Sequence, residues 1–202
     1  MYIEMLDLLR CPVEHEETWL VASFHRMDGR FVIEGKLGCP ICSAEYEITN
    51  GVADFGGARQ ETDRSEADDD AVIRTAALLN LTRPGSLAVL CGETAGVANR
   101  LAEMTQARII ALNPLTKIEE TELVGVVTTA GRIPLASSSV DAIAIGECNV
   151  AADAVRILKP GSRISARATV DLSPWFTVLA KDENDVVAEA KAQIVELRRS
   201  NA

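Results

Sequence analysis

Two cysteines separated by two residues, Cys39 and Cys42, form a knuckle of the kind that binds a metal ion. Another group of possible ligands lies upstream, where Cys11 is followed by Glu14 and His15. Thiolate sulfur and imidazole nitrogen are ligands that zinc favours. The spacing therefore predicts a tetrahedral zinc site made by Cys11, His15, Cys39 and Cys42.

Two alternatives remain open for these residues. Glu14 stands where the second cysteine of the first knuckle would be, and its carboxylate would supply a harder oxygen ligand. In the other alternative the metal is lost, and Cys39 and Cys42 are small core residues or free thiols. The odd number of cysteines, five, favours metal binding over disulfides in a cytosolic chain.

A second chemistry is indicated where an apolar run, residues 87–91, ends in a turn that contains Gly92 and Gly96. A helical pattern follows, and then a second apolar run at 108–112. Strand, glycine turn, helix and strand make one right-handed βαβ unit of a parallel sheet. Such a unit can place a nucleotide at the carboxyl edge of the sheet. The predicted buried face of its helix carries Val97, Leu101 and Met104.

The elements around this unit alternate between strands and helices, which predicts an α/β fold with a mostly parallel sheet. A helix is expected at 66–81, capped within Ser65–Asp68. Further strands are expected at 123–127, 140–146 and 163–170, with a helix at 149–158 and a final hairpin of 176–180 with 185–188. The connection of about five residues before the hairpin is too short for a helix, which should uncover Val178. Residues 193–199 either extend the last strand or form a tail.

The first 57 residues differ in pattern and predict a small β module. Two strand-like runs, 19–24 and 30–34, are joined at Asp28-Gly29, a hairpin signal. With the two knuckles, this is the layout of a zinc ribbon that has too little apolar mass to fold well alone. The expected domains are 1–57, a glycine-containing linker at 58–66, and a larger domain at 67–202.

The net charge of −10 argues against nucleic acid as the main partner, because phosphate binding needs a basic face. The N-terminus carries acids where a signal peptide would be positive, and no apolar run approaches the ~20 residues that span a bilayer. We therefore expect no membrane insertion and a cytoplasmic location.

The N-terminal module resembles a small zinc-ribbon family that binds and activates RNA and protein methyltransferases. The motifs that carry the resemblance are Leu-Leu-Arg-Cys-Pro at 8–12, Leu-Gly-Cys-Pro-Ile-Cys at 37–42, and Glu-Tyr-Glu-Ile-Thr-Asn-Gly-Val at 45–52. They occur in order and cover residues 1 to about 55. The departure at Glu14 concerns the metal and not the fold.

The larger domain resembles class I S-adenosylmethionine-dependent methyltransferases of the ubiquinone-biosynthesis type. The resemblance covers about residues 70–190 and is carried by residues 132–143 and by Arg-Ile-Leu-Lys-Pro-Gly at 156–161. It implies a Rossmann-like sheet, trimmed here by short crossovers. The implied cofactor pocket contains Gly92, Thr94, Gly96, Asn113 and Thr129.

The resemblance also implies that three acids of the family are replaced in this chain, by Leu90, Asn113 and Thr129, and that Thr94 stands at the position of the middle glycine. Each hydrogen bond from a cofactor hydroxyl to a carboxylate contributes about 1.5–3 kcal/mol to binding. Loss of the three acids could therefore weaken cofactor binding by orders of magnitude. Asn113 could still bond a ribose hydroxyl. S-adenosylmethionine is therefore a doubtful ligand.

No residue of the pocket is predicted to be catalytic. Glu147 and Cys148 follow a strand and are interpreted as loop and packing residues, and Cys91 as a small buried residue. The sequence favours a non-catalytic methyltransferase-like binding or scaffold protein in a protein assembly. The alternative is a methyltransferase with a cis-fused zinc-ribbon activator and an atypical pocket. The partner is expected to be another protein or a second copy of the chain.

Overall fold

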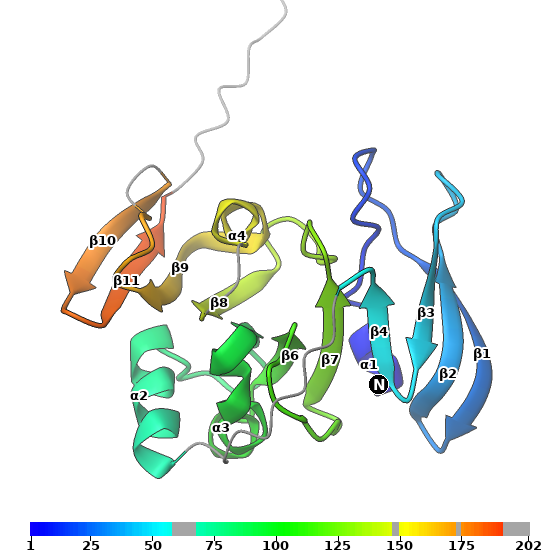
Figure 1. Cartoon of the computed structure of the whole chain (residues 1–202), viewed down its shortest axis with the longest axis horizontal. Helices are drawn as coiled ribbons and strands as arrows, with labels where there is room; N and C mark the ends of the chain where they lie inside the picture. Colours follow the sequence, from blue (N-terminus) through cyan, green and yellow to red (C-terminus); the bar gives the residue numbers. More distant parts are fainter. Residues whose placement is uncertain (58–67, 147–149, 173–174, 192–202) are drawn as a thin grey trace, which may run out of the picture.

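The computed structural model describes residues 1–57, 68–146, 150–172 and 175–191, and the strands in these ranges form one continuous sheet (Figure 1). The N-terminal strands are β1 (Val21–Asp28), β2 (Phe31–Gly38), β3 (Glu45–Thr49) and β4 (Val52–Phe55). The others are β5 (Leu87–Cys91), β6 (Arg108–Leu112), β7 (Val124–Thr129), β8 (Val140–Ile145), β9 (Leu158–Arg167), β10 (Phe176–Lys181) and β11 (Asp185–Ala190). The helices are α1 (Ile3–Leu6), α2 (Asp69–Leu79), α3 (Ala98–Thr105), α4 (Ala151–Ile157) and the 3-10 helix η1 (Gly92–Val97).

The centre of the sheet has the strand order β7-β6-β5-β8-β9, and all neighbouring strands in it are parallel. If these five strands are numbered 1 to 5 along the chain, from β5 to β9, their order in the sheet is 3-2-1-4-5, as in a doubly wound Rossmann sheet. The predicted mixed α/β, Rossmann-like fold is therefore confirmed.

Helices cover both faces of this parallel centre, which explains its continuous apolar strands. In β5 the side chain of Val89 packs with one cluster and that of Leu90 with the other, as the two-residue period of a strand requires. Residues of α1 and α4 share the cluster of Val89, whereas residues of α2 and α3 share that of Leu90. Leu90, which the resemblance places at the position of the family's first acid, is fully buried in the core.

The C-terminal strands form the predicted antiparallel hairpin, in which β11 pairs with both β10 and β9. The connection from β9 is short, and Val178 is 44% exposed, as expected for a sheet without a covering helix there. Residues 193–199, predicted either to extend the last strand or to form a tail, lie outside the described residues.

The N-terminal module is part of the same sheet, since β4 pairs in parallel with β7. A second connection is an isolated bridge between Leu9 and Leu135. In addition, the Met1 and Met5 side chains lie 3.5 Å from where a Cβ on Gly125 of β7 would be. The boundary predicted at 58–66 lies among residues that are not described.

Some predicted boundaries were wrong. Helix α2 begins at Asp69 and not at 66, because the Asp68 carboxylate caps it by accepting from the amide of Ala71. It ends at Leu79, since Asn80 adopts a left-handed backbone with φ of 54°. Ser65 is not described. The strand expected at 163–170 is β9, which already begins at Leu158.

Two predicted apolar positions also differ. Met104 is 49% exposed, because the buried face of α3 consists of Ala98, Leu101 and Ala102 instead. Trp19 was expected to begin the strand-like run 19–24 but lies outside β1. It is 66% exposed and forms an isolated bridge with Arg10.

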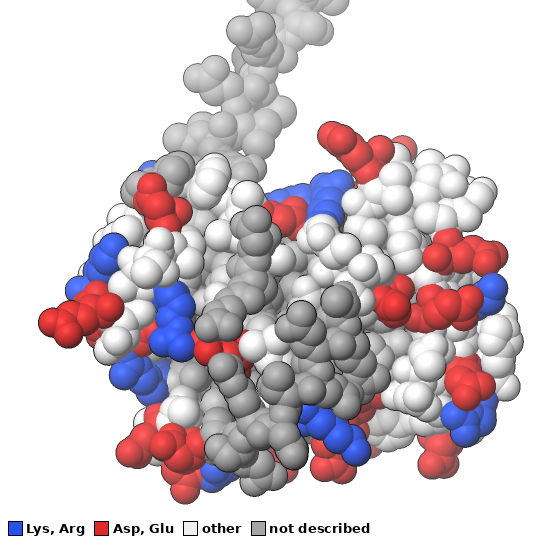
Figure 2. All heavy atoms as spheres, in the orientation of Figure 1, with Lys and Arg blue, Asp and Glu red and all other residues white. Residues whose placement is uncertain are grey.

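Residues 1–57 hold ten acidic and four basic residues, a net charge of −6. Figure 2 shows acidic side chains spread over the part of the molecule that holds this module. Among the described residues, none of the helices has the length and apolar character needed to cross a membrane.

Candidate functional site

The four predicted metal ligands come from two loops at one end of the N-terminal module. Cys39 directly follows β2, and a tight turn returns the chain to β3, with the amide of Ser43 bonded to the carbonyl of Cys39. The amide of Cys42 points to the Cys39 sulfur at 3.5 Å. The other loop carries Cys11 and His15, and the amide of Cys11 is bonded to the carbonyl of Thr18.

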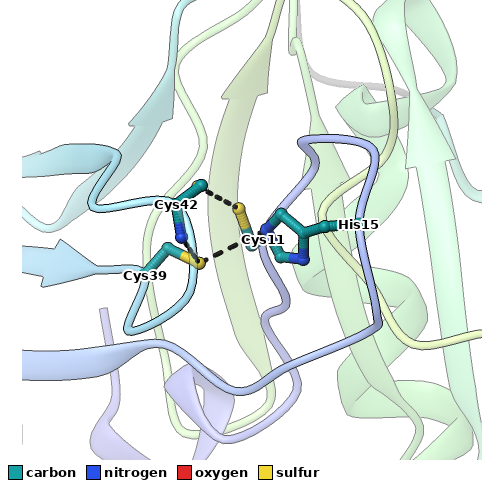
Figure 3. Close-up of side chains that lie close together, drawn as sticks. All are labelled: Cys11, His15, Cys39 and Cys42. Carbon is teal, nitrogen blue, oxygen red and sulfur yellow. Dashed lines mark hydrogen bonds between the residues drawn. The ribbon is translucent and has the colours of Figure 1, made fainter.

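The structure brings Cys11, His15, Cys39 and Cys42 together, with one ligand atom from each within 4.8 Å of all the others (Figure 3). The Sγ atoms of Cys11 and Cys42 are 3.7 Å apart, and His15 Nε2 lies 3.4 Å from Cys39 Sγ. Zinc bound tetrahedrally, with bonds of about 2.3 Å to sulfur and 2.0–2.1 Å to nitrogen, needs S–S and S–N separations of roughly 3.8 and 3.6 Å. These two separations are close to the required values, and all four ligand atoms lie within 4.8 Å of one another, so small shifts of the side chains would allow zinc binding.

Hydrogen bonds around the cluster hold its ligands in place. His15 Nδ1 is 2.6 Å from the carbonyl oxygen of Glu16, which can only accept, so Nδ1 carries the proton and Nε2 is free to bind a metal. The hydroxyl of Tyr46 lies 3.5 Å from Cys11 Sγ. Such outer contacts are typical of sites that bind a metal.

The pKa values of two of the thiols are shifted in opposite directions. Burial raises the pKa of Cys11. Burial also acts to raise the pKa of Cys39, but the amides of Cys42 and Ile41 and the neighbouring thiols outweigh it and lower the pKa to about 6. Glu14, the alternative ligand, is exposed and does not belong to the cluster.

The second candidate site is the carboxyl edge of the parallel strands, where the implied cofactor pocket would be. Gly92 and Gly96 lie in η1, which follows β5 directly. The Thr94 hydroxyl is within hydrogen-bond distance of the carbonyls of Cys91 and Ala144, at 3.0 and 3.1 Å. This bonding ties η1 down onto the ends of β5 and β8. A Cβ on Gly146, just after β8, would lie 2.7 Å from Cγ of Glu93.

Asn113 and Thr129 end neighbouring strands and are bonded to each other. The Asn113 carboxamide accepts from the Thr129 amide at 2.8 Å and donates to the Thr129 carbonyl at 2.9 Å. The Thr129 hydroxyl donates in turn to the carbonyl of Arg132 at 3.0 Å. Both polar groups of Asn113 therefore take part in this pair, and a ribose hydroxyl could use only the remaining hydrogen of Nδ2 or the second lone pair of Oδ1.

The segment that leaves β4 lies against the same pair. A Cβ on Gly57 would come within 2.4 Å of the Thr129 nitrogen and 2.9 Å of Asn113 Oδ1. The Asp54 carboxylate holds this segment by accepting from the amides of Gly56 and Gly57 and from the Thr128 hydroxyl. The N-terminal module thus covers the carboxyl ends of β6 and β7.

Sequence reasoning missed a cavity of about 520 Å3 at the carboxyl ends of β8 and β9. Its walls come from α2, η1, β8, β9 and the start of β11, which are far apart in sequence, so no local motif indicates it. The lining residues are Ala71, Arg74, Thr75, Leu78, Glu93, Thr94, Val97, Ala144, Ile145, Ser165, Ala166, Arg167, Asn184 and Asp185. Of the predicted cofactor residues, only Thr94 lines it. Glu147 and Cys148 lie outside the described residues.

Comparison with known protein families finds no match, and comparison with curated proteins finds none either. Solved structures do match. A protein of Galdieria sulphuraria assigned as a sarcosine dimethylglycine methyltransferase is 16% identical, with a TM-score of 0.40, over 52% of this chain and 50% of that one. The Haemonchus contortus phosphoethanolamine N-methyltransferase 2, solved with S-adenosylhomocysteine, is 15% identical (TM-score 0.43; 50% of this chain, 28% of that one). The cyclase SpnF is also 15% identical (TM-score 0.45; 62% and 64%).

The chain therefore spans half or less of the length of the first two of these proteins and about two thirds of the third. At these identities the likeness concerns the fold and does not extend to substrate or activity. From its own strand order and layers, the chain has a mixed α/β, Rossmann-like fold. Its structural neighbours include S-adenosylmethionine-dependent methyltransferases.

Proposed function

We propose that this chain is a methyltransferase-like protein without catalysis, which acts as a binding or scaffold subunit in a protein assembly. We further propose that its N-terminal module holds one structural zinc ion, with Cys11, His15, Cys39 and Cys42 as ligands. The zinc would join the two loops of the module, which has little apolar core of its own.

The observation that carries the first proposal is the bonded pair of Asn113 and Thr129. These residues stand where the family resemblance places its two nucleoside-binding acids, and here they bond to each other beneath Gly57. A nucleoside that reached this pair would have to displace Gly57, which lies against it. These two hydrogen bonds are part-buried, and a ligand that broke them would lose up to about 1–3 kcal/mol for each group left unsatisfied, which opposes binding.

Calorimetric titration with S-adenosylmethionine tests this proposal. We expect no heat of binding at micromolar concentrations and no shift in thermal unfolding. A ligand present at 100 times its Kd would add about 2.7 kcal/mol to the free energy of unfolding, so binding could not pass unnoticed. Micromolar affinity would overturn the non-catalytic reading and favour a methyltransferase with its activator module fused in cis.

The variant Asn113→Asp sharpens the test. A carboxylate can accept from the Thr129 amide but is repelled by the Thr129 carbonyl, to which Asn113 now donates. We expect the free energy of unfolding to fall by about 1–3 kcal/mol, with no gain in S-adenosylmethionine binding. The matched control is Asn99→Asp, whose amide also donates to a carbonyl, that of Glu119, but on the surface. If Asn113→Asp bound S-adenosylmethionine, the pocket would be open to the cofactor and would lack only this one carboxylate.

Exposed apolar side chains at both ends of the sheet support the assembly role. Trp19 and Val21 lie at the β1 end, 66% and 65% exposed, and Val178 and Leu179 lie on β10, 44% and 48% exposed. Light scattering on the purified chain should detect either a homodimer or, after mixing with lysate, a larger complex. A monomer that stays soluble at high concentration and binds no partner would contradict the assembly role.

A further inference from the structure

The cavity between α2, η1, β8, β9 and β11 carries no part of the function proposed above. Its volume of about 520 Å3 lies within the ~300–1,000 Å3 typical of small-molecule sites. It opens at the carboxyl edge of the sheet, where α/β proteins usually bind ligands. In Figure 1, α2 lies below β9 and β11 at the left of the molecule.

The charged residues of the cavity balance each other. Arg74 forms an ion pair with Asp185 at 2.5 Å, and Arg167 forms one with Glu93. These four are the charged side chains among its lining residues. A ligand with a single charge would therefore meet an equal number of like charges. A ligand that carries both charges can bind an arginine with its negative group and an acidic residue with its positive group. The lining therefore favours a zwitterion.

Ser165 supplies a polar group to the cavity. The residue is 8% exposed and lines the cavity near the end of β9. Its hydroxyl can donate a hydrogen bond to an anionic group of a ligand. Ser165 precedes Arg167 by two residues on β9, so a ligand carboxylate paired with the arginine lies within reach of the serine as well.

The remaining lining is small and apolar. Ala71 and Leu78 come from α2, Val97 from η1, and Ala144 and Ile145 from β8. Alanines leave room for a ligand group, and the larger side chains offer it apolar contact, which is worth about 25 cal/mol per Å2 buried. The cavity therefore combines a balanced charged part with an apolar part.

We propose that this cavity binds a free α-amino acid with an apolar side chain. The carboxylate pairs with Arg167 and accepts a hydrogen bond from Ser165, the ammonium group pairs with Glu93 or Asp185, and the side chain lies against Val97 and Ile145. This inference does not rest on the proposed function, because it uses other residues and would hold whether or not the chain methylates.

Calorimetric titration of the full-length protein with L-leucine, L-methionine and L-phenylalanine tests the proposal. We expect at least one of them to bind with one-to-one stoichiometry. For leucine the matched analogues are 3-methylbutylamine, which lacks the carboxylate, and 4-methylpentanoate, which lacks the ammonium group. For phenylalanine they are 2-phenylethylamine and 3-phenylpropanoate. Each analogue should bind at least about tenfold more weakly than its parent, the effect of one lost charged hydrogen bond of about 1.4 kcal/mol or more.

Variants locate the site. Arg167→Gln and Glu93→Gln should each weaken amino-acid binding about tenfold or more, and Ser165→Ala should weaken it by a smaller factor, because a neutral hydrogen bond is weaker than an ionic one. Arg163→Gln is the control, since Arg163 lies on the same strand but outside the cavity. The proposal is overturned if none of the three amino acids binds at millimolar concentration, if either analogue binds as tightly as its parent, or if Arg163→Gln weakens binding as much as Arg167→Gln.

Discussion

His15 distinguishes the predicted ligand set from its alternative. Its Nε2 lies 3.4 Å from Cys39 Sγ, and its Nδ1 is fixed by the carbonyl of Glu16, whereas Glu14 is exposed. The sequence supplied both candidates at adjacent positions, and spacing alone could not choose between an imidazole and a carboxylate. The loop fold decides it, because the bend after Cys11 turns His15 inward.

We expect His15→Ala to lose most of its zinc affinity, because it removes a direct ligand. Loss of an outer-shell partner already costs about 10- to 100-fold in affinity, and a direct ligand should cost at least as much. Competition with a chromophoric chelator, together with elemental analysis of the purified chain, measures this. Wild-type protein should carry close to one zinc per chain, and Cys39→Ser should release it.

Glu14→Ala is the matched control for His15→Ala, because the two residues are adjacent on the same loop. It should bind zinc like the wild type. Zinc loss in Glu14→Ala with retention in His15→Ala would reverse the assignment of the fourth ligand. A metal-free wild-type protein whose module is nevertheless ordered would remove the zinc altogether.

Asp141 acts at the scale of the elements, since it joins the starts of three strands. Its carboxylate accepts from the Leu87 amide of β5 at 2.9 Å and from Lys159 of β9 at 2.7 Å, and Arg83 lies 3.5 Å away. Burial acts to raise the pKa of Asp141, but the bonds from Lys159 and Leu87 and the charge of Arg83 outweigh it and lower the pKa.

We expect Asp141→Asn to reduce the free energy of unfolding by about 1–3 kcal/mol near neutral pH. A lowered folded-state pKa means that the unfolded chain binds the proton more readily, so Asp141 stabilises the fold above its unfolded pKa of about 3.9. This stabilisation is lost as the pH falls through the folded pKa. Urea unfolding of both proteins should thus show a difference at about pH 7 that shrinks below about pH 4.

Asp28→Asn, at the exposed end of β1, is the control for Asp141→Asn and should leave the free energy of unfolding unchanged. If Asp141→Asn were as stable as the wild type at neutral pH, or if its deficit persisted undiminished in acid, the stabilising role of the carboxylate would be refuted.

At the same scale, the sequence predicted the parallel strands at the centre of the sheet well. It did not predict that the N-terminal module would pair with β7 and cover the carboxyl ends of β6 and β7. Continuous apolar runs such as 87–91 and 108–112 indicate buried parallel strands through composition alone. Pairing of β4 with β7 is different, because it joins two short segments about 70 residues apart, and nothing in the four residues of β4 specifies a parallel partner. The position of Gly57 against the bonded pair of Asn113 and Thr129 depends on that arrangement, so it could not be predicted either.

For the whole molecule, the consequence is that the N-terminal module behaves as part of the larger sheet. Met1, Met5 and Leu9 are buried in the same cluster as residues of β5 and β6. Each fully buried side chain of this kind contributes about 1.5–3 kcal/mol. Removing the module would therefore cost a large part of the 5–15 kcal/mol by which a typical domain is stable. Its removal would also leave β7 as an exposed apolar edge strand, which promotes aggregation.

We therefore expect a protein cleaved at a protease site introduced within 58–66 to remain one particle. Both fragments should elute together in gel filtration and unfold in a single transition, because the β4–β7 pairing and the contact between Leu9 and Leu135 do not depend on that segment. Residues 58–202 expressed alone should aggregate. If the fragments separated after cleavage and the larger one stayed a folded monomer, the module would be an independent domain, and its shared sheet with β7 would contribute little to stability.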